Sequence, residues 1–451
     1  MISEKIAKYI ISFQYENVPE EVVEMTKNCL IDYFASAIAG SMEAPVQMIS
    51  EMVKEMGGHE QATCITGRQT SVAQAAFVNG AAGHVVELDD IHKQSIIHAA
   101  TVVIPAALAI AEWKHCSGKE LVAAIIVGYE VCYRIGEAVS PSHYFYWHNT
   151  ATCGTFGATA AAAKLLGLKE GEIIHALGSA GTQAAGLWEF IEDGAMSKQL
   201  HPGKAAMNGV ISALLAQKGF TGASQIFEGR RGFFEATSEA YDTNRVLKGL
   251  GKEFKLMENS YKMHASCRHT HAAMDLAIQL RKEKPFDIED IEEVIIDTYQ
   301  VALNITDNEN PRSIYAAKFS LQFCVALALA KGKGSLAEFS EESLHDPTIR
   351  SLMKKIAVEK SSEIDGQYPE KWGAALQILL KDGSRFEART DFPKGDPEAP
   401  FTTEEFIEKF NSLTENSGLD HIGLLQSLLN VEELSEVNSL FTNLFSSLAS
   451  K

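Results

Sequence analysis

Apolar residues recur every three or four positions through most of residues 1–258, which is the spacing that predicts amphipathic helices. The spacing is clearest at 20–40 and 118–139, and glycines near the segment ends supply helix stops. The segment 154–168 is rich in Gly, Ala and Thr, whose small side chains let a helix approach its neighbours closely. We therefore predict a helical region with a central buried helix at 154–168.

The pattern changes after this helical region. Residues 291–305 are predicted to form a strand, residues 318–332 a helix, and residues 374–390 a hairpin that turns at Asp382-Gly383. A Pro- and Gly-rich stretch then leads back to helical spacing. The prediction is a mainly α fold with an α+β portion, in which residues 1–258 are helical, residues 259–402 are α+β and residues 403–451 are again helical.

Composition narrows the class of protein. The 451 residues suffice for two domains, and 46% hydrophobic with 22% charged residues is typical of a globular chain. The net charge of -19, without a basic stripe, argues against nucleic acid, although a few cations in a cleft could still bind an anionic substrate. The seven scattered cysteines predict reduced thiols in the cytoplasm. Neither a secretory signal nor a membrane-spanning run is evident, so we expect no export and no membrane association.

Three histidines and three carboxylates crowd together immediately before an alanine-rich apolar stretch. Six ionisable groups in such a place carry a desolvation cost unless they serve one another or a ligand. The two aspartates could instead cap the next helix, and the first histidine could be a hydrogen-bonded core residue. A metal site at His84, Asp90 and His92 is a further alternative, although the spacing matches no motif of fixed geometry. The six residues are His84, Glu87, Asp89, Asp90, His92 and His98.

Two further segments carry candidate residues. His148 directly precedes the small-residue helix, and Tyr146 and Trp147 are expected to shield it from water. Its side chain could simply cap the helix, or it could be a functional imidazole whose pKa is lowered by the helix N-terminus. In residues 192–209, Lys198, His201 and Lys204 surround a Pro-Gly turn that lacks the GxxxxGK[ST] nucleotide motif and that could simply be an exposed basic turn. Lys198 could point inward as the partner of a carboxylate.

The segment 260–277 lies where the helical pattern gives way to the α+β pattern. Cys267 is flanked by histidines, which would suit a nucleophile or a metal ligand, yet no CxxC partner or thiolate-activating pattern accompanies it. Domain junctions often hold ligand clefts, which favours a binding role for Lys262 and for Arg268 as a bidentate clamp on a carboxylate.

Together these segments resemble the MmgE/PrpD family, which includes 2-methylcitrate dehydratases, cis-aconitate decarboxylases and iminodisuccinate epimerases. The resemblance implies a large all-helical domain formed by both chain ends, with a smaller α+β lid domain inserted between them. It also implies a homodimer whose active site lies between the domains and needs no cofactor and no metal. The segments that carry it are NGAAGHVVELDDIHKQSIIHAATVVIPAALAIAE, HNTATCGTFGATAAAAKLLGL, DGAMSKQLHPGKAAMNG, YKMHASCRHTH and LKDGSRFEARTDFPKGDPEAPFTTEEFIEKF.

The resemblance also places the family's site pattern on individual residues. The positions that match the catalytic or binding groups of the decarboxylases are Glu87 (where Asp is usual), His98, His148, Lys198 and Lys262. The chain departs from those enzymes at three other positions, where Thr, His and Tyr are usual: Ile91, Cys267 and Phe323. The remaining predicted substrate-binding residues are Asp90, His92, His201, Cys267 and Arg268.

Dehydration, decarboxylation and epimerisation of small polycarboxylates all pass through a carbanion or enolate beside a carboxylate, so the site needs a base, an acid and fixed cations. We predict His98 and His148 as the acid/base pair, because an imidazole pKa of about 6.5 suits proton transfer at neutral pH. Lys198 and Lys262 would neutralise the substrate carboxylates.

The prediction is a cytoplasmic, cofactor-independent hydro-lyase or carboxy-lyase that acts on a small di- or tricarboxylate. The alternatives are an epimerase of an iminodisuccinate-like dicarboxylate, a non-catalytic polycarboxylate-binding protein, and a metal-dependent hydrolase built on residues 87–98. An iron–sulfur route is disfavoured because the cysteines form no recognisable ligand set.

Overall fold

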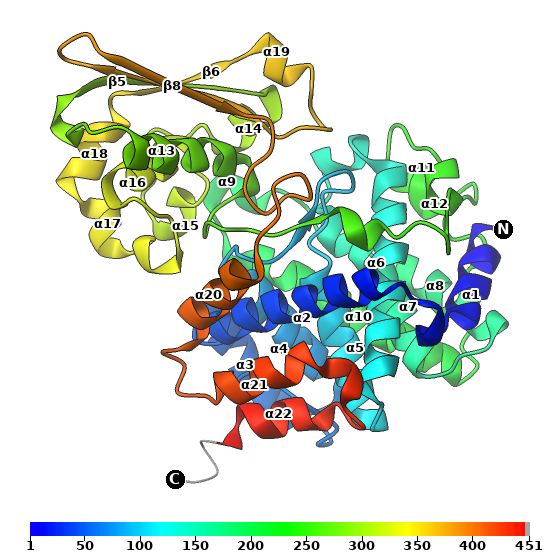
Figure 1. Ribbon diagram of the computed structural model, residues 1–451. Helices are drawn as coiled ribbons and strands as arrows, with labels where there is room; N and C mark the ends of the chain where they lie inside the picture. The colour runs from blue at the N-terminus through cyan, green and yellow to red at the C-terminus, as the bar shows by residue number, and fades with distance from the viewer. Residues whose placement is uncertain (447–451) are drawn as a thin grey trace. The chain divides into compact units, whose positions relative to one another are not determined.

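The computed structural model describes residues 1–446. These residues form mainly helices, together with a few strands (Figure 1). This confirms the prediction of a mainly α fold with some β structure. The chain forms two units: Met1–Asn259 with the chain from Thr403 onward, and Ser260–Thr402. Of the predicted C-terminal helical region, residues 447–451 lie outside the described residues.

The first unit is built mostly of helices. Its N-terminal portion contributes twelve of them: α1 (Ile2–Ser12), α2 (Glu20–Gly40), α3 (Ala44–Met56), α4 (Val72–His84), α5 (Ala100–Lys114), α6 (Gly118–Val139), α7 (Asn149–Leu165), α8 (Glu170–Gly181), α9 (Phe190–Asp193), α10 (Leu200–Gln217), α11 (Phe233–Thr237) and α12 (Asn244–Leu247). The C-terminal portion adds α20 (Thr403–Thr414), α21 (His421–Leu429) and α22 (Asn438–Leu444). Helix α20 packs against α2.

Helices α4, α5, α7 and α10 pack against one another at the centre of this unit, as the small-residue composition of α7 predicts. Glycines make two of the crossings close. A Cβ atom at Gly80 of α4 would lie 2.9 Å from the Cα atom of Gly203 of α10. A Cβ atom at Gly157 of α7 would lie 2.7 Å from the carbonyl oxygen of Gly128 of α6. These crossings bring the C-terminal end of α4 and the N-terminal ends of α7 and α10 into one region.

The expectation that residues 1–258 are mainly helical is confirmed, at 20–40 and 118–139 among others, but it misses three short strands. Strands β1 (Ala62–Thr63) and β2 (Gln69–Thr70) form a short antiparallel pair, and β3 (Ile91–His92) pairs with β4 (Asn259–Ser260), which directly follows this region. Two-residue strands carry no hydrophobic period, so the sequence pattern could not reveal them.

The second unit contains a four-stranded sheet in the order β6-β5-β7-β8, in which only the β5–β6 pair is parallel. Figure 1 shows helices α13 and α16 on one face of this sheet. The strands are β5 (Ile291–Thr298), β6 (Ile356–Lys360), β7 (Ala374–Leu380) and β8 (Arg385–Thr390). The helices are α13 (His271–Glu283), α14 (Gln300–Thr306), α15 (Ile314–Ala317), α16 (Leu321–Lys331), α17 (Glu341–His345), α18 (Pro347–Met353) and α19 (Ser362–Asp365).

The predicted helix at 318–332 and the hairpin at 374–390 are confirmed by α16 and by the β7–β8 pair. The predicted strand at 291–305 is wrong in its second half, because β5 ends at Thr298 and α14 begins at Gln300. The carboxylate of Asp365 accepts a hydrogen bond of 2.9 Å from the backbone N–H of Gln300 and so starts this helix. That partner lies 65 residues away, so local periodicity cannot show it.

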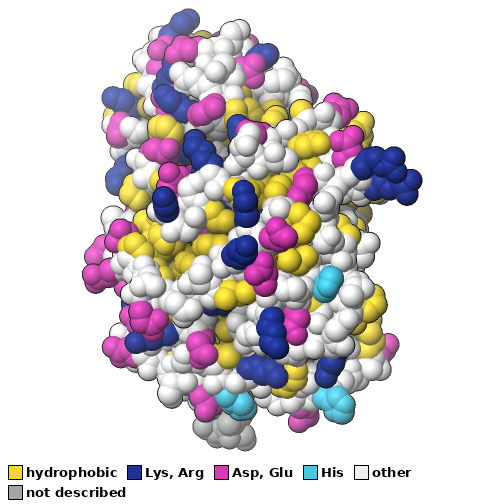
Figure 2. Space-filling view, turned by 90° about the vertical axis from the view of Figure 1, so that its right-hand side faces the viewer, with side chains coloured by type: hydrophobic (Ala, Val, Ile, Leu, Met, Phe, Trp, Pro, Cys, Tyr) yellow, Lys and Arg dark blue, Asp and Glu magenta, His cyan; other side chains and the backbone are white. Residues whose placement is uncertain are grey.

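Two surface properties bear on possible partners. None of the helices in residues 1–446 is long and apolar enough to cross a membrane. On the face shown in Figure 2, basic and acidic side chains are interspersed and form no continuous basic stripe.

Candidate active site

The predicted cluster lies on a buried loop between α4, which ends at His84, and α5, which begins at Ala100. Asp90 anchors this loop. Its Oδ1 accepts a hydrogen bond of 3.0 Å from the Ala100 N–H, and its Oδ2 accepts bonds of 2.8 Å from Tyr129 and 2.9 Å from Asn259. Burial raises the pKa of Asp90 to about 7. Both carboxylate oxygens of Asp90 thus hold the protein together, and its substrate-binding role stays a prediction.

The backbone of the loop is strained at two positions. Glu87 has φ of 62° and Ile96 has φ of 54°, in the left-handed region that residues other than glycine seldom adopt. A β-branched residue such as Ile96 is especially disfavoured there. Such strain costs on the order of 1–3 kcal/mol and persists where the surrounding structure enforces it, often at functional sites. The loop is thus held in a fixed conformation next to the histidines.

His98 lies at the end of this loop and is mostly buried. Its Nδ1 lies 2.6 Å from the carbonyl oxygen of Asp90. A carbonyl oxygen can only accept, so Nδ1 carries the hydrogen, and in the neutral ring Nε2 is left as an acceptor. The backbone N–H of His98 donates to the Thr150 hydroxyl at 3.1 Å. His98 therefore has the tautomer and the fixed orientation of a general base.

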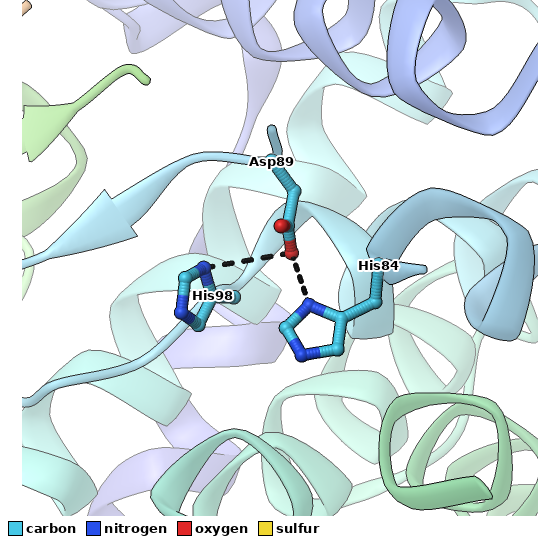
Figure 3. A group of neighbouring side chains, drawn as sticks. All are labelled: His84, Asp89 and His98. Atoms are coloured by element: carbon cyan, nitrogen blue, oxygen red, sulfur yellow. Dashed lines mark hydrogen bonds and ion pairs between the residues drawn. The ribbon is translucent and has the colours of Figure 1, made fainter. Parts of the chain in front are cut away.

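Asp89 connects two histidines. Its Oδ2 lies 2.6 Å from Nδ1 of His84 and 3.5 Å from Nδ1 of His98 (Figure 3). The ring of His84 is fully buried, and its Nε2 has no hydrogen-bond partner among the described residues. The sequence suggested a helix cap or an orienting carboxylate for Asp89, and a core position or a metal ligand for His84. The geometry agrees with an orienting carboxylate, because Asp89 lies next to both imidazole rings.

His148 forms the other side of the histidine cluster. It occupies the N-cap position of α7, but its side chain makes no capping hydrogen bond, so simple capping does not account for it. Its Nδ1 lies 3.1 Å from Nδ1 of His201. Its ring packs against Trp188 at 5.0 Å, whereas Tyr146, which was predicted to shield it, is exposed. Trp188 belongs to no motif, so nothing in the sequence signals this contact.

The pKa values change the role expected for His148. Burial, with the charges of neighbouring histidines and Lys198, holds its pKa well below the ordinary value. Burial also lowers the pKa of His201 to about 4. Both rings are neutral at pH 7. The lowered pKa predicted for His148 is confirmed in its direction, with burial as the main cause, whereas the ordinary pKa expected for an acid/base pair is not. A neutral ring can donate and accept hydrogen bonds, but it is a poor general acid at neutral pH.

Lys198 and Glu87 form a buried ion pair, with Nζ of Lys198 in contact with Oε1 of Glu87. Lys198 lies on the short 3₁₀ helix η3 (Met196–Gln199). The inward orientation predicted for Lys198 is therefore correct. The predicted exposed Pro-Gly turn is wrong, because His201 lies in the first turn of helix α10.

His92 belongs to a different group. Its Nδ1 lies 2.8 Å from the Ser95 hydroxyl, its Nε2 lies 3.3 Å from Glu258, and its ring stacks on Tyr133 at 4.2 Å. The predicted metal set of His84, Asp90 and His92 is thus not brought together. The predicted substrate-binding role of His92 gains no support from these contacts.

Three predicted site residues, Lys262, Cys267 and Arg268, lie in the second unit and are buried. The charge of Lys262 adds to burial in lowering the pKa of His269 to about 3. The backbone N–H of Cys267 donates to the Lys318 carbonyl at 2.9 Å. The catalytic role of Lys262 and the binding role of Cys267 stay predictions.

Arg268 is engaged within its own unit. Its Nη2 lies 2.5 Å from Oδ1 of Asp396, and its Nη1 donates to the carbonyls of Tyr261 at 3.0 Å and Lys394 at 3.1 Å. Both terminal nitrogens are occupied in a buried ion pair and its hydrogen bonds, and the predicted bidentate clamp on substrate stays a prediction.

We expect Arg268→Met to lower the free energy of unfolding by about 3–5 kcal/mol, because it removes the cation next to a buried carboxylate. Arg389→Met is the matched control, since Arg389 forms only half-exposed pairs with Glu363 and Asp391 and should cost less than about 1 kcal/mol. Urea unfolding measures the free energy of unfolding of both variants. Equal decreases in the two variants would contradict the interpretation of the Arg268–Asp396 contact as a buried ion pair that stabilises the fold.

Two groups of three side chains in residues 1–446 have donor atoms that metals prefer: His84, Asp89 and His98, and His92, Glu137 and Glu258. In the first group, Nδ1 of His98 donates to the Asp90 carbonyl, so this ring could offer an ion only its Nε2. In the second, Nζ of Lys255 lies 2.9 Å from Glu137 and 3.0 Å from Glu258 and supplies the positive charge. The second group is therefore already balanced by a cation of the protein.

His143 gives a pH-dependent prediction outside the site. Burial lowers its pKa to about 4, against about 6.5 in an unfolded chain, so the unfolded state binds more protons between these values. The contribution of neutral His143 to stability is present above about pH 6.5 and is lost as pH falls towards 4. The stability gap between wild type and His143→Gln should therefore narrow by up to about 2 kcal/mol from pH 7 to pH 5. Urea unfolding at the two pH values measures this difference in stability. A difference that stays the same from pH 7 to pH 5 would contradict the prediction.

Comparison with known proteins places this chain in a family. The MmgE/PrpD N-terminal domain model matches residues 4–245, and the MmgE/PrpD C-terminal domain model matches residues 264–421. The chain therefore belongs to the MmgE/PrpD family, as its sequence motifs predicted.

Named relatives include lyases of two kinds. The chain is 28% identical to the cis-aconitate decarboxylase of Aspergillus terreus over 97% of this chain and 95% of that protein. It is 27% identical to the cis-aconitate decarboxylase-like protein oryM of Aspergillus oryzae over 97% of this chain and 96% of that protein. It is 28% identical to the 2-methylcitrate dehydratase of Salmonella typhimurium over 52% of this chain and 51% of that protein.

Proposed function

We propose that the chain is a cofactor-independent lyase that acts on a small di- or tricarboxylate by moving a proton at a carbon beside a carboxylate. The observation that carries the proposal is the geometry of His98, whose Nδ1 donates to the Asp90 carbonyl, so that Nε2 is the acceptor nitrogen of the neutral ring. Its surroundings include a buried lysine, which could stabilise developing negative charge.

For dehydration, Nε2 of His98 takes a proton from the carbon beside a carboxylate, and the C–H electron pair moves into that carboxylate as an enolate. The pair then returns to form the C=C bond as the C–O bond of the β-hydroxyl breaks. The proton that His98 has taken from carbon passes to the leaving hydroxide, so that water leaves and His98 is neutral again. One histidine that acts first as base and then as acid balances this reaction.

For decarboxylation, the C–C bond to one carboxylate breaks, CO2 leaves, and the electron pair is delocalised onto the rest of the polycarboxylate. His98 in its imidazolium form then delivers a proton from Nε2 to carbon. Both reactions therefore use one histidine as proton carrier and one cation to hold the developing negative charge. The relatives matched over nearly their full length are a decarboxylase and a decarboxylase-like protein, which supports decarboxylation as the first reaction to test.

Lys198 is the proposed cation of this mechanism. Its charge is balanced by Glu87 in the free protein, which limits the cost of burying an ammonium group. A substrate carboxylate that binds near Lys198 would either contact the ammonium group together with Glu87 or take the place of Glu87. We propose that Lys262 supplies a second cation. We also propose that the protein acts as a homodimer in the cytoplasm.

NMR in D2O tests the proposal. Purified protein is incubated separately with citrate, 2-methylcitrate, cis-aconitate and iminodisuccinate, and deuterium incorporation, water loss and CO2 release are followed. Loss of CO2 or water with deuterium incorporated beside a carboxylate is the expected result. Exchange that merely inverts a stereocentre would instead indicate an epimerase. No exchange with any of the four compounds would contradict the carbanion mechanism, and stoichiometric metal found by elemental analysis would contradict cofactor independence.

A further inference from the structure

His148 and His201 contact each other through the same ring atom, Nδ1. The two nitrogens lie 3.1 Å apart, which is a hydrogen-bond distance. His148 comes from the N-terminal end of α7, and His201 comes from the first turn of α10. Burial lowers the pKa of both rings, so both are neutral at pH 7. A neutral imidazole carries one hydrogen, so one of the two Nδ1 atoms donates and the other accepts.

Aromatic rings and the backbone hold this pair of histidines in place. Trp188 packs against the ring of His148 at 5.0 Å, and Phe190 packs against the ring of His201 at 5.5 Å. The backbone N–H of His148 donates to the Gly186 carbonyl at 2.9 Å. Gly186 has φ of 147°, and a Cβ atom there would lie 2.7 Å from the nearest side chain and 3.4 Å from Nδ1 of His201. The chain therefore needs glycine at this position to come so close to the two rings.

The other rings next to His148 have hydrogen-bond partners of their own. The indole N–H of Trp188 donates to the Trp147 carbonyl at 3.0 Å. The ring of His84 lies 5.7 Å from that of His148, but its Nδ1 lies 2.6 Å from Asp89. The partner of Nδ1 of His148 is therefore His201.

The second ring nitrogen of His148, Nε2, is the atom that can meet a ligand. It makes no hydrogen bond with any of residues 1–446, and it is not among their fully buried atoms, whereas Nε2 of His84 is. The positive charge of Lys198 acts on the same ring, so an anionic group is attracted to this place. An anion accepts hydrogen bonds, which favours a hydrogen on Nε2. That tautomer leaves Nδ1 of His148 as the acceptor, so His201 must be the donor.

We propose that His201 is a positioning residue that donates a hydrogen bond from Nδ1 to Nδ1 of His148 and so keeps the His148 hydrogen on Nε2, from which it is donated to an oxygen of the bound substrate. This inference rests on the proposed function, in which negative charge develops on such an oxygen. It serves both candidate reactions, because charge moves onto carboxylate oxygens after proton removal and after loss of CO2. His148 is then a neutral hydrogen-bond donor rather than the acid of an acid/base pair.

Nitrogen NMR shows which ring nitrogen carries the hydrogen, without any need for turnover. The protein is labelled with 15N-histidine, and the signals of the two histidines are assigned by their absence in His148→Asn and His201→Asn. In the wild type at pH 7 we expect the hydrogens on Nε2 of His148 and on Nδ1 of His201. A hydrogen on Nδ1 of His148 would overturn the inference.

Two substitutions separate the donor of His201 from its bulk. His201→Phe keeps a ring but donates no hydrogen bond, so the His148 hydrogen should be divided between its two nitrogens, and kcat should fall by up to about 100-fold, the scale of a misplaced group. His201→Asn has a side-chain N–H that can take the place of the one on Nδ1, so it should restore the His148 tautomer and most of kcat. His421→Asn is the matched control, because His421 also lies partly buried in the first turn of a helix, α21, and it should change neither quantity.

A purely structural role for His201 gives a different result. Both variants would then lower kcat to a similar extent while the His148 hydrogen stayed on Nε2, and that outcome would overturn the inference. If His201→Phe does not fold, the positions of the two hydrogens in the wild type decide the question. The expected tautomers in a protein that turns over none of the four compounds would support the positioning role while contradicting the proposed function. Turnover with the hydrogen on Nδ1 of His148 would do the reverse.

Discussion

Replacing His98 with Asn is expected to lower kcat by about 100- to 10,000-fold, which is the range that a positioned proton carrier contributes. Asn can reproduce the N–H that His98 donates to the Asp90 carbonyl at 2.6 Å, so the loop should keep its conformation. It has no ring nitrogen that takes up a proton near neutral pH. The loss should therefore appear in kcat with little change in the free energy of unfolding, as measured by steady-state kinetics and urea unfolding.

His115→Asn is the matched control for this experiment. His115 is exposed, and it adopts the left-handed conformation at φ of 54°, which Asn tolerates. The same chemical change there should leave kcat and stability close to the wild-type values. A His98→Asn enzyme with near wild-type kcat would remove His98 from the mechanism.

Replacing Lys198 with Met is expected to have two separable effects. It should lower kcat/KM by roughly 10- to 150-fold, because a charge-assisted contact with substrate worth about 1.5–3 kcal/mol is lost. It should also lower the free energy of unfolding by about 3–5 kcal/mol, because it removes the cation that contacts buried Glu87. Kinetics and urea unfolding report the two effects independently.

A double variant distinguishes these effects. Adding Glu87→Gln to Lys198→Met removes the buried negative charge, so most of the lost stability should return while kcat/KM stays low. Lys204→Met, at an exposed lysine of α10, is the control and should change neither quantity. Recovery of kcat/KM together with stability would show that Lys198 acts only through folding.

Much of the fold could be predicted from local sequence pattern. Residues 20–40 and 118–139 form α2 and α6 as predicted, because each buries a continuous apolar face and carries its own start and stop signals. The errors lie where a distant residue decides the local structure. Helix α14 begins where Asp365 caps Gln300, and the short strands β1 and β2 depend on pairing with each other.

The candidate site could be predicted as a set of segments but not as a geometry. The family resemblance points to His98, Lys198 and Glu87. The sequence does not show the contacts of Asp90 and Arg268, because their partners, such as Tyr129 and Asp396, lie far away in the sequence. Burial, which lowers the pKa of His148, likewise depends on packing that a single sequence does not show.

The role of His98 as the proton carrier is tested most directly by hydrogen exchange at carbon. Wild type and His98→Asn are incubated in D2O with the compound that wild type turns over, and deuterium at the carbon beside the carboxylate is followed by NMR. We predict incorporation by wild type and at least about 100-fold slower incorporation by His98→Asn. Incorporation at equal rates in the two proteins would contradict this role.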